Sequence, residues 1–372
     1  MKYPLMIPNI TETDISAVTD VLRSGMLTQG LQVGLFEETI SCLTKVDESI
    51  AVSNGTASLH LALIALGVGP GDEVIVPAFS YIATANVVEL VGATPIFVDI
   101  ELSTFTIDTS KIESAISTKT KAIIPVHEFG LAAEITKICQ IASKHSIFVI
   151  EDAACALGAM ENNMPVGSFG DLGSFSFHPR KSITSGEGGI ITTKSSKLSS
   201  HCRSLRNHGI DPDNKSSMEF VAAGYNYRLT DIQAAMLNSQ LTRFNEMLEV
   251  KSLLANVYLN ELNESACIVP SIPENKNHTW QTFHIVLDEA ISQEKIISEL
   301  KGKGIGTNYG AQCIPDQTFY KNKYGFDSKT LFPNAYRAYK SGLAIPLYYG
   351  LTDTDISIIS MQINNSFQNV KK

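Results

Sequence analysis

Residues 174–189 read SFSFHPRKSITSGEGG, a stretch that sets two adjacent cations among hydroxyls, apolar side chains and a cluster of glycines. A surface lysine needs no such surroundings, and a strand in a protein core does not tolerate an unpaired charge. Two interpretations of Lys181 are open at this point. It is either a loop lysine whose ammonium reaches solvent or a reactive amine in a binding site.

The composition is that of an ordinary globular protein. The chain has 372 residues, 44% of them hydrophobic, which is enough for a large core and for two domains. The formal net charge of −9 disfavours nucleic acid as a partner. No apolar run is long enough to cross a bilayer, the N-terminus lacks a signal-peptide pattern, and the six scattered cysteines lack metal-site or disulfide spacing. We expect a soluble cytoplasmic protein with reduced thiols, no metal and no membrane contact.

On both sides of the opening stretch, strand patterns alternate with helical patterns. The expected strands are residues 72–79, 94–100, 121–129, 146–153 and 188–194, and the expected helices are residues 9–25, 53–67 and 80–92. This alternation predicts an α/β fold with a mainly parallel sheet.

A long helical pattern over residues 229–262 leads to a different kind of sequence. Beyond it, WQTFHIVL (residues 280–287) is typical of a strand, and residues 291–305 are typical of a helix. We therefore predict a large domain over residues 1–245 and a smaller C-terminal α+β domain over residues 246–372.

Two further features suit a ligand crevice. Ligands of open α/β sheets bind at the carboxyl ends of strands, and residues 146–153 end in Glu151 and Asp152. Asp152 either lies at the base of such a crevice or caps a following helix. SNGTAS, residues 53–58, precedes an apolar helix, and backbone N–H groups at a helix start favour phosphate. Many helices start this way without a ligand, and the GxxxxGK[ST] spacing of a P-loop is absent.

Lys181 joins these two features into one set. Arg180 beside it and burial of the loop disfavour the charged ammonium, and a neutral amine is the form that attacks a carbonyl. A phosphate turn, the strand-end Asp152 and a reactive Lys181 are what a pyridoxal 5′-phosphate (PLP) site requires. They anchor the phosphate, keep the pyridine nitrogen protonated and hold the aldehyde.

With these residues in place, the chain resembles the sugar aminotransferases of the DegT/DnrJ/StrS group, which are fold-type I PLP enzymes. The resemblance covers nearly the whole chain and includes SNGTASLHLAL, GDEVIVPAFSYIATANVV, IEDAACALGA, GDLGSFSFHPRKSITSGEGG and GYNYRLTDIQAA. It implies the three-layer, aspartate-aminotransferase-like large domain and a smaller C-terminal domain.

The resemblance also implies roles for cofactor-binding residues. Lys181 corresponds to the lysine of the internal aldimine, and Asp152 to the partner of the pyridine nitrogen. Gly55 and Thr56 correspond to the phosphate-binding turn, and Ser176, on the same strand as the lysine, to a further phosphate contact.

Three other positions carry implied roles. Tyr81 corresponds to the aromatic residue that stacks on the cofactor ring, and Glu187 is a candidate substrate contact. Asn226 resembles the residue that reaches the phosphate of a neighbouring subunit, with Arg228 as the alternative. The resemblance therefore implies a homodimer with a shared active site.

The chain departs from the family pattern in two places. Cys155 stands where the family usually has Gln or His, and cysteine is a poor hydrogen-bond partner for the ring oxygen of the cofactor. Residues 308–320, NYGAQCIPDQTFY, replace a commoner His-Tyr-x-Pro-Leu-His pattern of the small domain. The substrate pocket is therefore expected to differ from that of many relatives.

The implied reaction moves an amino group from glutamate to a nucleotide-linked keto-sugar, with a 4-keto-6-deoxy sugar favoured. A 3-keto sugar or a non-sugar ketone such as a cyclitol is the alternative. Products of this kind feed surface polysaccharides, glycan modification or antibiotics. The related 3-dehydrase branch has histidine in place of Lys181, which argues against that chemistry.

Other classes of function fit less well. A non-catalytic relative would be expected to lose the lysine, the aspartate and the phosphate turn. A Rossmann dehydrogenase requires a GxGxxG between the first strand and its helix, which is absent. A nucleophilic Cys155 with His178 as its base lacks any sign of an oxyanion site. His127 and His208 lie in matching segments but are as easily structural.

Overall fold

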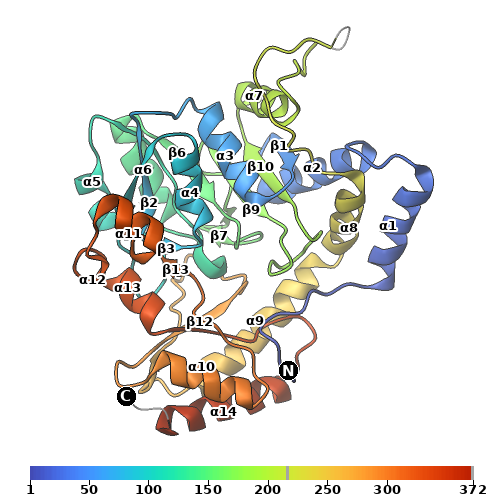
Figure 1. Ribbon diagram of the computed structural model, residues 1–372. Coiled ribbons are helices and arrows are strands. Elements are labelled where there is room, and N and C mark those ends of the chain that lie inside the picture. The colour runs from blue at the N-terminus through green and yellow to red at the C-terminus, as the bar shows by residue number, and fades with distance from the viewer. Residues whose placement is uncertain (215–217, 370–372) are drawn as a thin grey trace.

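The computed structural model describes residues 1–214 and 218–369. A seven-stranded sheet of order β1-β10-β9-β6-β5-β2-β4 forms the centre of its larger part (Figure 1). In chain order the strands are β1 (Glu48–Val52), β2 (Glu73–Pro77), β4 (Thr94–Val98), β5 (Thr120–Ile123), β6 (Phe148–Asp152), β9 (Leu172–Ser176) and β10 (Gly189–Thr193). The strands from β9 to β4 run parallel, and β10 pairs antiparallel with β9 and β1. The predicted α/β fold with a mainly parallel sheet is confirmed.

This sheet is the middle of three layers. Because successive side chains of a strand point to opposite faces, Val74 and Val76 of β2 pack in one core and Ile75 packs in another. The helices of the first face are α3 (Gly55–Ala65), α4 (Ala83–Leu90) and α7 (Ser196–Arg206). Those of the opposite face are α2 (Leu31–Thr44), α6 (Ile135–His145) and α8 (Asp231–Leu241).

The first predicted helix is present as α1 (Glu12–Ser24). Thr11 is its N-cap, and its backbone N–H donates to Asp14 Oδ2 at 2.8 Å, as in a capping box. Gly25 ends the helix with a φ of 72°, a left-handed conformation that glycine adopts without a steric penalty.

The long helical pattern of residues 229–262 is two helices and not one. α8 ends at Leu241, and α9 (Phe244–Glu261) begins after a break at Thr242 and Arg243. At this break the Arg243 guanidinium forms an ion pair with the buried Asp14 of α1, with Nη2 2.6 Å from Oδ2. The apolar pattern continues through both helices, which is why the sequence alone did not reveal the break.

A second, antiparallel sheet lies beyond α9. It consists of β11 (Cys267–Ile268), β12 (Phe283–Leu287) and β14 (Gly342–Ile345), with α10 (Gln293–Gly302) and α14 (Asp353–Asn369) packed in the same core. The segments between β12 and β14 also reach the large sheet, since Tyr320 and Phe332 contact Phe97 of β4 edge to face. The domain division at residue 245 stays a prediction.

The remaining short elements connect these layers. They are α5 (Ile112–Ala115), α11 (Thr318–Tyr324), α12 (Ser328–Leu331), α13 (Pro333–Lys340), the pair β3 (Phe79–Ser80) with β13 (Gln312–Cys313), the pair β7 (Met160–Glu161) with β8 (Met164–Pro165), and 3₁₀ turns at Thr109–Lys111, Glu128–Gly130 and Ile314–Asp316. Within the described ranges, no helix has the length and apolar character needed to span a membrane.

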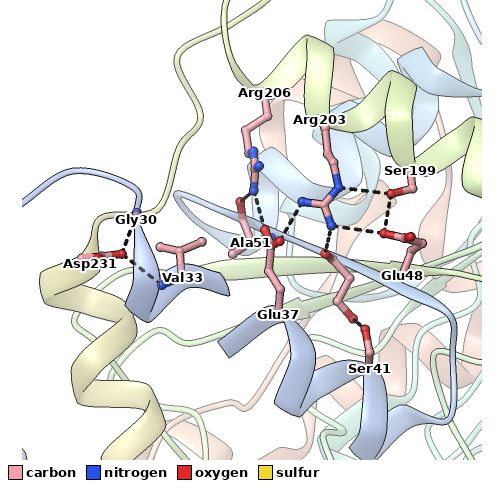
Figure 2. A network of polar contacts seen from close by, with 11 residues as sticks. Gly30, Val33, Glu37, Ser41, Glu48, Ala51, Ser199, Arg203, Arg206 and Asp231 are labelled. Atoms are coloured by element: carbon pink, nitrogen blue, oxygen red, sulfur yellow. Dashed lines mark hydrogen bonds and ion pairs between the residues drawn. The ribbon is translucent and has the colours of Figure 1, made fainter. Parts of the chain in front are cut away.

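A charged network fixes the end of β1, from which the 53–58 turn starts. Figure 2 shows Glu37 of α2 between Arg203 and Arg206 of α7. The guanidinium nitrogens lie 2.7 and 2.6 Å from the two carboxylate oxygens of Glu37, and Arg206 also donates to the carbonyl of Ala51 in β1 at 2.8 Å. Charge-assisted bonds of this kind are short and directional, so they hold β1, α2 and α7 in one arrangement.

Asp231, in the RLTD segment, has a related structural role. Its Oδ1 accepts the backbone N–H groups of Gly30 at 2.8 Å and Val33 at 3.0 Å (Figure 2). These are donors at the start of α2 that have no partner inside the helix. Asp231 therefore joins the start of α8 to the start of α2.

Candidate active site

A cavity of about 560 Å³ lies at the carboxyl ends of β6 and β9. Most residues that were predicted to form the site line it together: Gly55, Thr56, Tyr81, Asp152, Cys155, Ser176, Lys181 and Glu187. They come from segments far apart in the chain. The sheet topology brings them to one edge, as expected for a ligand site of an open α/β fold.

The start of α3 forms an anion-binding turn in the cavity wall. The Asn54 side chain caps the helix by accepting the N–H of Ala57 at 2.8 Å, which leaves the N–H groups of Gly55 and Thr56 in the first turn without helical partners. A Cβ atom on Gly55 would lie 2.8 Å from Cβ of Ser176, so only glycine permits this close approach of β9. The N–H groups of Gly55 and Thr56 and the hydroxyls of Thr56 and Ser176 thus line one part of the cavity, where a phosphate can bind.

Asp152 is a buried carboxyl and not a helix cap. Thr84 Oγ1 donates to Oδ2 at 2.8 Å, and the N–H of Ala154 donates to Oδ1 at 3.2 Å, while no helix begins at this point. Burial raises the pKa of Asp152, and the bonds from Thr84 and Ala154 oppose that shift. A protonated ring nitrogen placed against Asp152 would favour its ionised form further.

Lys181 lies in the loop after β9, so its expected position on the same strand as Ser176 is wrong. β9 ends at Ser176, because the chain then turns and the Lys181 N–H donates to the carbonyl of His178 at 2.8 Å. Lys181 is half-buried, and its Nζ donates to Cys155 Sγ at 3.0 Å. Arg180 also lines the cavity but is exposed.

Cys155 is paired with Lys181 and not with His178. Burial raises the pKa of its thiol, which keeps it neutral, and a neutral sulfur is a weak hydrogen-bond acceptor. Nδ1 of His178 instead accepts the N–H of Arg180 at 3.2 Å. The arrangement gives no support to a cysteine nucleophile.

Tyr81 and Glu187 are both exposed residues of the cavity wall. The Tyr81 side chain is 59% exposed, which leaves its ring free to cover a ligand. Glu187 is exposed in the glycine-rich turn, where its carbonyl accepts from Gln233 Nε2 at 2.7 Å.

Asn226 is the predicted residue that does not line the cavity of its own chain. Its segment is nonetheless tied to the phosphate turn, since Ser53 N–H donates to the carbonyl of Tyr227 at 2.8 Å. Tyr227 lines the cavity, whereas Asn226 is exposed. Its alternative, Arg228, donates to the side chain of Asn207.

His127 and Glu151 have structural roles. His127 is fully buried, its Nδ1 accepts the N–H of Ala133 at 3.0 Å, and its Nε2 lies 3.0 Å from Glu151. Glu151 also accepts three backbone N–H groups from Gly167, Phe169 and Gly170. This network supports the floor of the site beneath Asp152 and does not face the cavity.

Sequence reasoning missed two buried ionisable residues beside the cavity. Glu128 lines it next to Asp152, and burial raises the pKa of Glu128 to about 8. Lys251 of α9 lies behind the Lys181 loop, with Nζ 3.3 Å from Ser182 Oγ, and burial lowers its pKa to about 7. Glu128 directly follows His127 at a strand end, a signal that was available. Lys251 has no such signal, because nothing in a helical pattern marks which polar residue is buried.

The donor set of the cavity fits PLP. The backbone of Gly55 and the side chain of Ser176 line the cavity side by side, and a buried carboxyl and an amine line the same cavity. The Tyr81 ring is free to cover the cofactor ring. An anion, a ring nitrogen and an aldehyde would each meet the group that its chemistry requires.

Comparisons with known proteins identify the family. The family model of the DegT/DnrJ/EryC1/StrS aminotransferase family matches residues 8–364. GDP-perosamine synthase of Caulobacter vibrioides is 38% identical over 86% of each chain. UDP-4-amino-4-deoxy-L-arabinose–oxoglutarate aminotransferase of Shewanella sediminis is 34% identical over 97% of each chain.

A solved structure is also similar to this chain in three dimensions. Spr1654 of Streptococcus pneumoniae, described as a candidate sugar aminotransferase and solved in a PLP form, superposes with a TM-score of 0.94 over 100% of both chains at 32% identity. Similarity of this extent covers the large sheet and the C-terminal region together. The chain therefore belongs to the DegT/DnrJ/EryC1/StrS aminotransferase family and is a PLP-dependent transaminase.

Proposed function

We propose that this transaminase transfers an amino group from glutamate to a nucleotide-linked keto-sugar, with a 4-keto-6-deoxy sugar as the favoured acceptor. The observation that carries the proposal is the convergence of Lys181, Asp152 and the Gly55 turn on one cavity of about 560 Å³. The relatives named above for perosamine and 4-amino-arabinose supply the substrate class. A further relative, SpsC of Bacillus subtilis, is named for spore coat polysaccharide biosynthesis, which supports a role of the product in polysaccharide synthesis.

The residues divide the work by their chemistry. When bound, PLP supplies an electron sink that stabilises negative charge on the carbon next to the transferred nitrogen. The N–H groups of Gly55 and Thr56 and the hydroxyl of Ser176 would hold the phosphate. Asp152 would accept a hydrogen bond from the protonated ring nitrogen, and the amine of Lys181 would hold the aldehyde carbon.

Lys181 would have a second task whenever its amine is free. It would take the proton from the substrate carbon and hold it at Nζ for its return, which is general acid–base catalysis within one cavity. Tyr81 covers the ring, and Glu187 at the exposed rim is placed to contact the sugar. The exposed position of Glu187 suits a large nucleotide-linked ligand better than a small keto acid.

A panel of ketones tests the substrate class. With glutamate as donor, we expect amination of at least one UDP-, TDP- or GDP-linked 4-keto-6-deoxy sugar, detected by mass spectrometry of the product. The panel includes 3-keto sugars and a keto-cyclitol, because these are the alternative acceptors. If glutamate converts the cofactor to its amine form but no nucleotide sugar accepts the amine, the substrate class is wrong and the transaminase chemistry stands.

We further propose a homodimer in which Asn226 contacts the cofactor phosphate of the other subunit. Support comes from its exposure beside Tyr227, whose carbonyl is bonded to the phosphate turn. A homodimer with this arrangement has two equivalent sites, each built from both chains.

Mixing two inactive variants tests the shared site. Lys181→Ala and Asn226→Ala homodimers are each expected to lose activity at limiting PLP, and exchange of subunits should restore up to about a quarter of the sites, because a hybrid dimer has one intact site. The matched control mixes Lys181→Ala with Asp152→Asn. Both of these residues belong to the same chain's site, so no hybrid has an intact site. Equal recovery in the two mixtures, or no recovery in either, would contradict the shared site.

A further inference from the structure

Glu128 is a buried carboxyl in the cavity to which the reaction outlined above gives no task. Its side chain is 4% exposed, and among the described residues its Oε2 is buried without a hydrogen-bond partner. Buried carboxyl oxygens without a partner are costly and rarely kept without a reason. The same cavity wall contains Asp152, Lys181 and Cys155.

The strand order places Glu128 close to Asp152. β6, β5 and β2 are neighbours in the sheet, and their carboxyl ends lead to Asp152, Glu128 and Ser80, respectively. The turn that bears Glu128 is strained, since Phe129 has a φ of 54°. That strain is held by the β12 side of the fold, where the N–H of Thr279 donates to the carbonyl of Gly130 at 2.9 Å. Backbone strain kept in this way occurs preferentially at functional sites.

Two hydroxyl side chains lie between the two carboxyls. Thr84 Oγ1 donates to Asp152 Oδ2 at 2.8 Å, Ser80 Oγ lies 3.1 Å from Thr84 Oγ1, and Ser80 neighbours the Glu128 carboxyl. Each hydroxyl has a single proton to donate. Because Thr84 donates to Asp152, Ser80 must donate to Thr84, and no proton of Ser80 remains for a Glu128 carboxylate.

A neutral carboxylic acid at Glu128 could instead donate to Ser80. An ionised Glu128 would accept the Ser80 proton, and Ser80 Oγ and Thr84 Oγ1 would face each other with no proton between them. Burial raises the pKa of Glu128 to about 8, the negative charge of Asp152 acts in the same direction, and the positive charge of Lys181 opposes the shift without cancelling it. The commitment of the Ser80 proton to Thr84 and the burial of Glu128 therefore both favour the neutral acid.

We propose that Glu128 serves the active site as a neutral acid, which donates to Ser80 and so positions Asp152, and which keeps Oε2 as an acceptor for an O–H or N–H group of the bound ligand. Glu128 is thus a positioning residue for Asp152 and a ligand contact. This inference rests on the proposed roles of Asp152 and Lys181 in holding PLP. It adds a second carboxyl that is neutral, whereas the carboxyl of Asp152 is ionised.

Two substitutions at one position separate the neutral acid from a carboxylate. Glu128→Gln keeps the shape, one N–H donor for Ser80 and one C=O acceptor, whereas Glu128→Leu removes both. We expect PLP to bind the Gln variant with a dissociation constant within about threefold of the unaltered chain, and the Leu variant roughly tenfold or more weakly, because it loses a bond that supports a charged group. Equal weakening of both variants would mean that the carboxylate is the working form. Unchanged binding by both would remove Glu128 from the site.

The proposed hydrogen bond from Glu128 to Ser80 has its own test. If Glu128 acts through Ser80, then Ser80→Ala and Glu128→Leu break the same hydrogen bond, and the double variant should bind PLP no more weakly than the weaker single variant. If the two single-variant losses of PLP affinity multiply in the double variant, Glu128 does not act through Ser80. If the unaltered chain binds PLP, unchanged binding by the variants argues only against the role of Glu128. If the unaltered chain does not bind PLP at all, the proposed function itself is wrong.

The stability of the cofactor-free chain gives a readout independent of catalysis. The folded chain keeps the Glu128 proton up to a pKa of about 8, whereas the unfolded chain releases it near the ordinary value of 4.5. The free energy of unfolding should therefore fall as the pH rises between these values. Asp152, Lys181 and Cys155 face Glu128 in both proteins, so the difference between the unaltered chain and Glu128→Gln isolates this contribution. Parallel pH profiles would overturn the neutral-acid assignment.

Discussion

Lys181→Ala is expected to abolish transamination, with a loss of roughly 10³–10⁴-fold or more, because one amine both holds the aldehyde and moves the proton. The absorbance of covalently bound PLP should vanish. The phosphate turn at Gly55 is untouched by the substitution, so PLP should still bind non-covalently, and its fluorescence or equilibrium dialysis would measure this. The variant therefore separates the covalent attachment from the binding of the phosphate.

Lys197→Ala is the matched control for this experiment. Lys197 is an exposed lysine of α7 that does not line the cavity, and its removal should leave the spectrum and the rate unchanged. If Lys181→Ala kept the absorbance of the covalent form, the attachment point would lie elsewhere. The buried Lys251, which neighbours the Lys181 loop through Ser182, would then be the residue to examine.

Asp152→Asn is expected to give the second-largest loss, about 10²–10³-fold in the rate of the glutamate half-reaction, because a buried charge opposite the ring nitrogen is removed. Asparagine keeps the size of the side chain and an acceptor for Thr84, so the fold should be preserved. The rate at saturating PLP, measured from the spectral change on adding glutamate, is the relevant quantity. A weakened PLP affinity with an unaltered rate would show that Asp152 only binds the cofactor.

Thr84→Val is a useful comparison for Asp152→Asn. It leaves the carboxylate in place but removes the hydroxyl that donates to Oδ2 at 2.8 Å. We expect a smaller effect than that of Asp152→Asn, since the charge remains and only its orientation is released. A Thr84→Val effect as large as that of Asp152→Asn would indicate that orientation, and not charge, is what the site requires.

Much of the architecture could be predicted because it is encoded locally. The alternation of strand and helix patterns predicts a mainly parallel sheet, and Thr11 and Gly25 mark the ends of α1 through bonds to residues a few positions away. The phosphate turn is local in the same sense, since Asn54, Gly55 and Thr56 are consecutive. Lys181 and Asp152 were found because adjacent residues and strand ends marked them.

Other features depend on contacts between distant segments and could not be predicted. The break between α8 and α9 brings Arg243 to Asp14, and the partner of Cys155 is Lys181 and not His178. Ser80 and Thr84 are unremarkable in the sequence, and the strand-end position of Glu128 does not reveal its neighbours. Only the neighbouring positions of β6, β5 and β2 bring them to Asp152.

The sequence by itself determined the class of fold, the phosphate turn and the residues that mark the chemistry, because periodicity, capping and short motifs act over a few residues. The tertiary structure decided which of these groups touch, where Lys181 lies relative to β9, and that a second carboxyl shares the cavity with Asp152. The physical reason is that the burial and charge state of a side chain depend on its neighbours in space. In this protein those neighbours are set by the order of the strands and not by the order of the residues.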